Sequence, residues 1–146
     1  MPNVTYSFSS GTRIQSSQVN TNFSEVAAAI RPTFVFTIVG TLVTGTNLTP
    51  ALIANNTLTI VQAYAYVKTV NTGASLIIDL NKNGTSLWNV TQANRLTIAA
   101  SDADKYATQT SFDTTSLAEG DILTLDIDAV GSTISGESLT VQLRCM

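Results

Sequence analysis

Residues 57–84 show the clearest alternation of hydrophobic and polar positions in the chain, and they read TLTIVQAYAYVKTVNTGASLIIDLNKNG. Successive side chains of a β-strand point to opposite faces, so a period of two residues predicts a strand. Between residues 57 and 70, one alternate set is Leu58, Ile60, Gln62, Tyr64, Tyr66 and Lys68, and the other is Thr59, Val61, Ala63, Ala65, Val67 and Thr69. A second strand follows, and Asn83-Gly84 is the dipeptide most typical of a tight hairpin turn.

The chain after residue 32 repeats this pattern, with no helix between the alternating segments. It predicts eight strands, at residues 34–43, 57–70, 75–81, 85–89, 95–99, 105–112, 121–130 and 137–145. The inward faces of the last two are Leu123, Leu125, Ile127 and Ala129, and Leu139, Val141, Leu143 and Cys145. We therefore expect a mainly β fold, an eight-stranded antiparallel β-sandwich of jelly-roll-like form. An immunoglobulin-like sandwich is the alternative, disfavoured by the strand count and the missing Cys…Trp…Cys pattern.

Residues 1–32 predict an extended arm followed by one short α-helix. In the arm, residues 1–15, Tyr6 and Phe8 alternate with polar residues, and the apolar content is too low for the arm to fold alone. We expect these two aromatic residues to dock the arm on a neighbouring molecule. Residues 17–30 form the helix candidate, which Ser16 or Ser17 can cap and Pro32 ends. Its apolar residues are Val19, Phe23, Val26 and Ile30.

The spacing of those four apolar residues is that of a coiled-coil seam. A helix of about 14 residues is marginal in water alone and needs a partner surface. That surface is either the β domain of the same chain or the helices of further copies in a short bundle. We divide the chain into an anchoring and oligomerisation segment, residues 1–32, and a sandwich domain, residues 33–146.

The composition is poor in charge: of 146 residues, 12% are charged, and the net charge is −3. About a quarter of residues are charged in a typical domain. A neutral polar surface suits strands that contact other subunits, although an ordinary β domain rich in threonine has the same composition. The seven Lys and Arg residues are scattered, which argues against nucleic-acid binding. No stretch has the ~20 apolar residues of a membrane span, and the N-terminus lacks the form of a signal peptide.

Residues that carry catalytic or metal chemistry are sparse. The chain has no histidine and one cysteine, Cys145, so it offers no Ser-His or Cys-His pair and no His/Cys metal site. Residues 79–84, DLNKNG, match half of a calcium-loop signature, but Val90 stands where its last ligand should be, so we interpret them as a hairpin turn. Asp126 and Asp128 share a strand face about 7 Å apart, as glycosidase carboxylates can, but surface acids often do so. We expect no enzyme activity and no cofactor.

Four aromatic residues are candidates for a ligand site or a subunit interface: Tyr64, Tyr66, Trp88 and Tyr106. Aromatic rings pack against the apolar faces of sugars, but they also fill cores and interfaces. In the strand of residues 57–70 one face is bulky and the other small. Both faces can therefore be buried, one in the sandwich and one against a neighbour, and we favour an interface over a sugar site.

Two parts of the chain resemble bacteriophage virion structural proteins. Residues 11–30, GTRIQSSQVNTNFSEVAAAI, are similar to an N-terminal segment of such proteins with the pattern GT-x-I-x-A-x-x-V-N-x-N-F, except that serine stands where alanine is common. Residues 40–145 resemble a small domain of head-decorating and tail-fibre-like proteins through the segments TPALIA, AYAYVKT, GASLIIDLNKNGTSLW, TQANRLTIAA, TSFDTTSLAEGDILTLDID and VGST. The resemblance implies a jelly-roll-like domain, commonly trimeric, and brings no catalytic residues.

We therefore expect a non-enzymatic structural protein of the virion, most simply a capsid decoration (cement) or head-fibre protein. It would assemble as a homotrimer and dock by its N-terminal arm on the major capsid protein or another virion protein. Decoration is preferred because the chain is expected to be complete as an anchor plus one domain, without the shaft of a tail fibre. The alternative is a tail-fibre or baseplate receptor-binding protein that recognises host-surface glycans. Neither nucleic acid nor a membrane is an expected partner.

Overall fold

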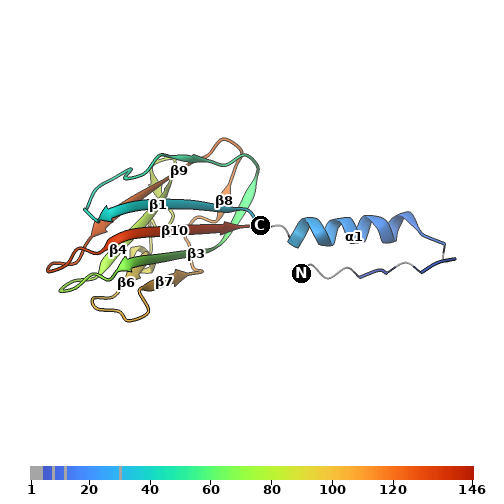
Figure 1. Ribbon diagram of the computed structural model, residues 1–146. Helices are drawn as coiled ribbons and strands as arrows, with labels where there is room; N and C mark the ends of the chain where they lie inside the picture. The colour runs from blue at the N-terminus through green and yellow to red at the C-terminus, as the bar shows by residue number, and fades with distance from the viewer. Residues whose placement is uncertain (1–4, 8, 12, 30) are drawn as a thin grey trace. The chain divides into compact units, whose positions relative to one another are not determined.

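A computed structural model describes residues 5–7, 9–11, 13–29 and 31–146. The chain divides into two compact units, one of Met1–Pro32 with Met146 and one of Thr33–Cys145. The first holds α1 (Ser16–Ala29) and the second holds the strands (Figure 1). Phe8 and Ile30, which the sequence placed among the anchoring residues, lie outside the described residues.

The helix begins one residue before the predicted range, so neither Ser16 nor Ser17 is its cap. Gln15 precedes the helix, and its carbonyl accepts the backbone N–H of Gln18 at 3.0 Å and of Val19 at 3.3 Å. The side chain of Gln18 reaches back and accepts the backbone N–H of Gln15 at 3.1 Å. This is the reciprocal half of a capping box, which satisfies one N–H that the helix start would otherwise leave unpaired.

The second unit is a sandwich of two antiparallel sheets, as the sequence predicts. In the first sheet the order is β1 (Thr33–Thr41), β10 (Glu137–Cys145), β3 (Leu58–Thr69) and β7 (Tyr106–Gln109), and β8 (Ser116–Leu117) also pairs with β3. In the second the order is β2 (Leu52–Ile53), β9 (Ile122–Ala129), β4 (Leu76–Lys82) and β5 (Thr85–Ser86), and β6 (Leu96–Ile98) also pairs with β4. A short 3₁₀ helix, η1 (Gln92–Asn94), connects β5 to β6.

The described part of the chain has ten strands rather than the eight predicted, and the fold class is confirmed. Each predicted strand corresponds to an observed one, and the additional strands are β2 and β8. Both are two residues long and lie in segments that read as loops. Two residues cannot display a period of two, so only the pairing with β9 and β3 reveals these strands.

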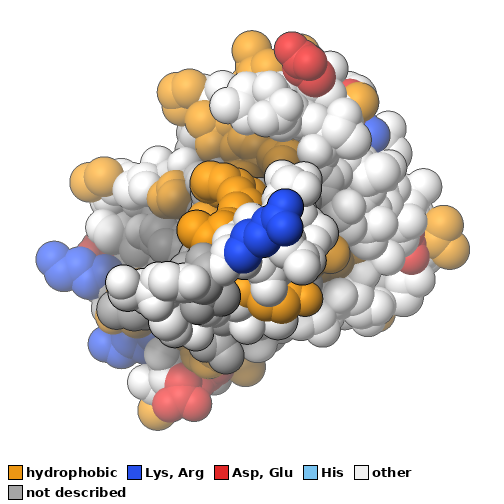
Figure 2. Space-filling view, turned by 90° about the vertical axis from the view of Figure 1, so that its right-hand side faces the viewer, with side chains coloured by type: hydrophobic (Ala, Val, Ile, Leu, Met, Phe, Trp, Pro, Cys, Tyr) orange, Lys and Arg blue, Asp and Glu red, His pale blue; other side chains and the backbone are white. Residues whose placement is uncertain are grey.

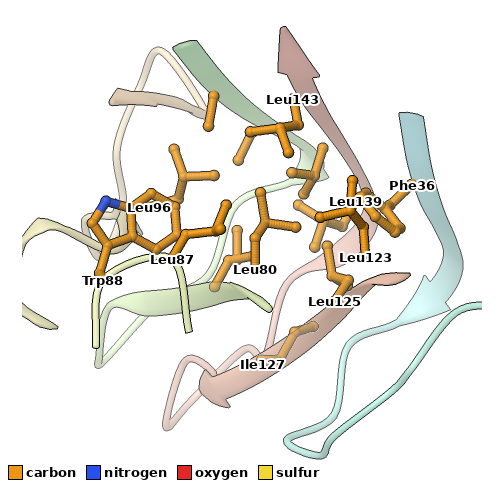
Figure 3. Packing of buried hydrophobic residues seen from close by; sticks show 14 of the residues in the cluster. Phe36, Leu80, Leu87, Trp88, Leu96, Leu123, Leu125, Ile127, Leu139 and Leu143 are labelled. Carbon is orange, nitrogen blue, oxygen red and sulfur yellow. The ribbon is translucent and has the colours of Figure 1, made fainter. Parts of the chain in front are cut away.

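The core lies between the two sheets, and the alternation of β9 and β10 fills it. Leu123, Leu125 and Ile127 of β9 are buried, as are Leu139, Val141, Leu143 and Cys145 of β10. Trp88, Leu87 and Leu96 close one end of this core in Figure 3, and Phe36 of β1 lies toward the other. The predicted inward faces of the last two long strands are therefore correct, apart from the half-buried Ala129.

One irregularity in β3 changes which residues face the core. Ile60 and Ala63 are both buried, although strict alternation would put them on opposite faces. Arg144 of β10 pairs with Gln62, but the next residue, Cys145, pairs with Ile60, so Val61 is the extra residue of a β-bulge. The bulge shifts the phase, so neither alternate set read from the sequence lies wholly on one face.

Residues 79–84 form the predicted hairpin turn. β4 and β5 pair antiparallel on either side of a two-residue turn. Asn83 and Gly84 have positive φ angles of 50° and 79°, the conformation that asparagine and glycine adopt at least cost. Asp121, which directly precedes β9, stabilises the turn. Its carboxylate accepts a hydrogen bond from the side-chain amide of Asn83 at 2.7 Å and forms an ion pair with Lys82 at 2.9 Å.

Candidate functional site

The helix of the first unit carries an apolar surface, which we call the helix stripe: Val19, Phe23 and Val26. The three residues, together with Asn22, line a hollow of about 210 Å³. Phe23 is 70% exposed and Val26 is exposed as well. Exposed apolar area of this kind favours association, because its removal from water is worth about 25 cal/mol per Å². The sequence-predicted seam residues thus share one face for as much of the helix as the structure describes.

The arm contacts the helix of its own chain through polar groups. Asn22 makes two hydrogen bonds with the backbone of Tyr6: its side-chain oxygen accepts the N–H at 3.1 Å, and its amide donates to the carbonyl at 2.8 Å. The Thr5 backbone N–H and hydroxyl both donate to Glu25. Asn22 thus pairs with the arm as a neighbouring strand would. The sequence motif gave Asn22 no role. Its role is visible only in the structure, which brings Asn22 beside Tyr6 although 16 positions separate them.

A second surface, the tyrosine face, lies on the outer side of the first sheet: Tyr64, Tyr66 and Tyr106. Because Ala63, Ala65 and Val67 point into the core, the tyrosines of β3 point out. The register places Tyr66 between Thr140 of β10 and Tyr106 of β7. The sequence-predicted aromatic residues on β3 and β7 are therefore brought together, although 40 positions separate Tyr66 from Tyr106.

The tyrosine face encloses a shallow hollow of about 200 Å³, which Thr140 and Gln142 also line. Tyr66 is 51% exposed and Tyr106 is 45% exposed. Beside them, the hydroxyl oxygen of Tyr64 accepts a hydrogen bond from the Arg144 guanidinium at 3.2 Å. That bond fixes one edge of the hollow, while the two other rings stay open to solvent.

Trp88 does not join this surface, which corrects its place among the candidate ligand-binding aromatics. Its side chain is fully buried, with an exposed fraction of 0%. The ring stacks on Phe112, with centroids 5.2 Å apart and planes 25° apart. The indole N–H donates to the carbonyl of Ser111 at 2.6 Å, so both its apolar and its polar parts are satisfied within the core.

The acidic residues singled out on β9 are held by structural partners. Asp126 accepts the backbone N–H of Asn47 at 2.7 Å and the side-chain amide of Asn81 at 2.8 Å. Asp128 pairs with Arg95. On β4, burial raises the pKa of Asp79, which accepts a hydrogen bond from a serine hydroxyl. The contacts of Asp126 with Asn47 and of Asp128 with Arg95 tie segments outside the strands to the second sheet.

Other features of the described residues bear on the class of protein. Among them, no group of three or more His, Cys, Asp or Glu side chains gathers to hold a metal ion. Within the same ranges, no helix has the length and apolar character to cross a membrane. Charged side chains are few and scattered on the surface seen in Figure 2, in line with the 12% charged content. Cys145 is buried, and burial raises the pKa of its thiol to about 11.

Sequence reasoning missed the polar residues that border the tyrosine face. Thr140, Gln142 and Arg144 alternate with the inward residues of β10, so the sequence pattern places them outward and says nothing more about them. Their closeness to the tyrosines depends on the pairing of β10 with β3. No local sequence signal states that the last strand lies between the first and third strands, since this follows from the whole topology (Figure 1).

Comparison with known proteins gives a likeness in fold. No family model matches the chain, and no curated protein matches its sequence. A chain from the solved capsid of Ralstonia phage GP4 is similar in structure, with a TM-score of 0.50 and 17% sequence identity. The similarity covers 80% of this chain and 84% of that one. Because the sequence identity is this low, the comparison shows only that the two chains share a fold.

Proposed function

We propose that this protein is a non-enzymatic structural component of a phage virion, and that it decorates the capsid as a cement or head-fibre protein. The observation that carries the proposal is the structural likeness to a chain of a phage capsid, which extends over 80% of this chain. The resemblance of residues 11–30 to an N-terminal segment of phage virion proteins points the same way.

The strand pairing favours a jelly roll within this proposal. The pairs are nested: β1 with β10, β2 with β9, β3 with β8 and β7, and β4 with β6 and β5. Nested antiparallel pairs arise when one long hairpin is rolled into two facing sheets, which is the form of a jelly roll. Jelly rolls are common among viral capsid domains, so the topology supports the proposed role.

The helix stripe supports assembly as a homotrimer. A lone helix of this length is marginal, and Phe23 and Val26 expose apolar side chains along one face of it. Three copies that meet along this face would bury the stripe in the manner of a coiled coil. The arm is bonded to the helix through Asn22, which lines the same hollow as the stripe, so it would lie along the edge of the seam, where it can dock on the major capsid protein or another virion protein.

Two measurements on the native particle test this function. The protein should remain with the heads when tails are sheared from virions, and cryo-electron microscopy should place its sandwich on the capsid surface. Sedimentation equilibrium of the purified full chain should give three times the mass of one copy, 15.4 kDa. Recovery of the protein only in the tail fraction would contradict capsid decoration, and a single-copy mass at all concentrations would contradict the trimer.

A further inference from the structure

The geometry of the tyrosine face points to a binding site for a neutral saccharide, and we propose this as a second activity of the sandwich. Such a site could serve a protein of the head or of the tail of a virion. Three tyrosines on adjacent strands, Tyr64 and Tyr66 on β3 and Tyr106 on β7, border one hollow.

The two open rings provide the apolar part of such a site. Tyr66 and Tyr106 are directly opposite each other in the β3–β7 register. Opposite residues on neighbouring strands have Cβ atoms about 4.5–5.5 Å apart, so their rings lie side by side. Tyr66 and Tyr106 are each about half exposed, so their rings are not part of the core. A pyranose has one face of C–H groups, and aromatic rings offer the flat apolar surface that this face needs.

The rim of the hollow supplies hydrogen bonds without charge. Thr140 and Gln142 line it together with the tyrosines, so hydroxyl and amide groups both donate and accept there. No charged side chain is among the described residues that line the hollow, and Arg144 beside it is engaged by Tyr64 at 3.2 Å and by Gln62 at 3.4 Å. A ligand with many hydroxyls and no net charge matches this rim, because hydroxyls need paired donors and acceptors when water is displaced.

The size and electrostatics disfavour other occupants. The hollow of about 200 Å³ is smaller than the ~300–1,000 Å³ of sites for drug-sized ligands, so it suits one or two sugar rings. Single-stranded nucleic acid also stacks on aromatic rings, but it requires clustered cations along its backbone.

The test is a glycan array probed with the full chain, carrying neutral hexose and N-acetylhexosamine oligosaccharides beside sialylated and sulfated ones. The strongest neutral glycan is then titrated by calorimetry into wild type, Tyr66→Ala and Tyr106→Ala. We expect about tenfold weaker binding for each alanine variant, a loss that corresponds to about 1.4 kcal/mol. Tyr66→Phe, which keeps the ring, should retain most of the affinity.

Val39→Ala is the matched control, because Val39 is an apolar residue on β1 of the same sheet with 86% exposure. It should bind the neutral glycan as wild type does. Binding of no neutral glycan, or equal binding by wild type and both alanine variants, would overturn the proposal. A lower oligomeric mass for Tyr66→Ala would do the same, since it would make the tyrosine face an interface between copies. Thermal melting of each variant verifies that it is folded, and Tyr106→Ala replaces Tyr66→Ala if the latter is not.

Discussion

Replacing Phe23 with alanine should weaken self-association while leaving the sandwich intact. Phe23 is 70% exposed in the single chain, so up to that fraction of its side chain can be buried when copies associate. Full burial of a phenylalanine is worth about 1.5–3 kcal/mol, which gives about 1–2 kcal/mol for each helix in the bundle. Over three copies the loss is about 3–6 kcal/mol, or a factor of about 10²–10⁴ in the association constant.

Sedimentation equilibrium at several loading concentrations measures this change directly. The wild-type chain should fit a monomer–trimer equilibrium, and Phe23→Ala should shift the midpoint to higher concentration by the square root of that factor, about 10- to 100-fold. Val39→Ala removes a side chain that is even more exposed, and it should leave the equilibrium unchanged. Equal association constants for wild type and Phe23→Ala would refute the assignment of the helix stripe as the seam.

Three further predictions concern the core, an acid and the arm. Trp88→Ala should cost about 3–5 kcal/mol in urea unfolding, because it leaves a cavity where a fully buried ring now packs. Hydrogen bonds lower the pKa of Asp121 from 3.8 to about 2, and the one from the backbone N–H of Ala118 has the largest effect. Folding therefore gains from this carboxylate above about pH 4 and loses that gain as the pH falls to about 2, so Asp121→Asn should flatten the acid limb of a stability profile. Asn22→Ala should speed hydrogen exchange at the Tyr6 amide by removing its acceptor.

The parts of the fold that follow from local polarity could be predicted from the sequence. In β9 and β10 the two faces differ sharply, so Leu123, Leu125 and Leu139 were placed inward correctly. The turn at Asn83 was equally legible, since few dipeptides tolerate positive φ at both positions. The bulge at Val61 was not, because it depends on how β3 pairs with a strand some 80 residues later.

The candidate surfaces were predictable to different degrees. The helix stripe follows from spacing alone, because side chains three and four residues apart share a helix face. The tyrosine face needs the β3–β7 register, which no local pattern encodes. Trp88 was misjudged because the strand predicted at residues 85–89 ends at Ser86, so the alternation of a strand does not set the direction of the Trp88 side chain. Its indole partner, Ser111, also lies outside the strands, 23 residues later.

Cys145 is a natural chemical probe of how often the sandwich opens. It is the single thiol of the chain, and it sits at the end of the strand flanked by β1 and β3. A thiol reagent reacts with the thiolate, which burial suppresses by raising the pKa to about 11. The labelling rate of the unmodified protein should therefore follow how often the last strand detaches, and it would time the opening of the domain without any engineered probe.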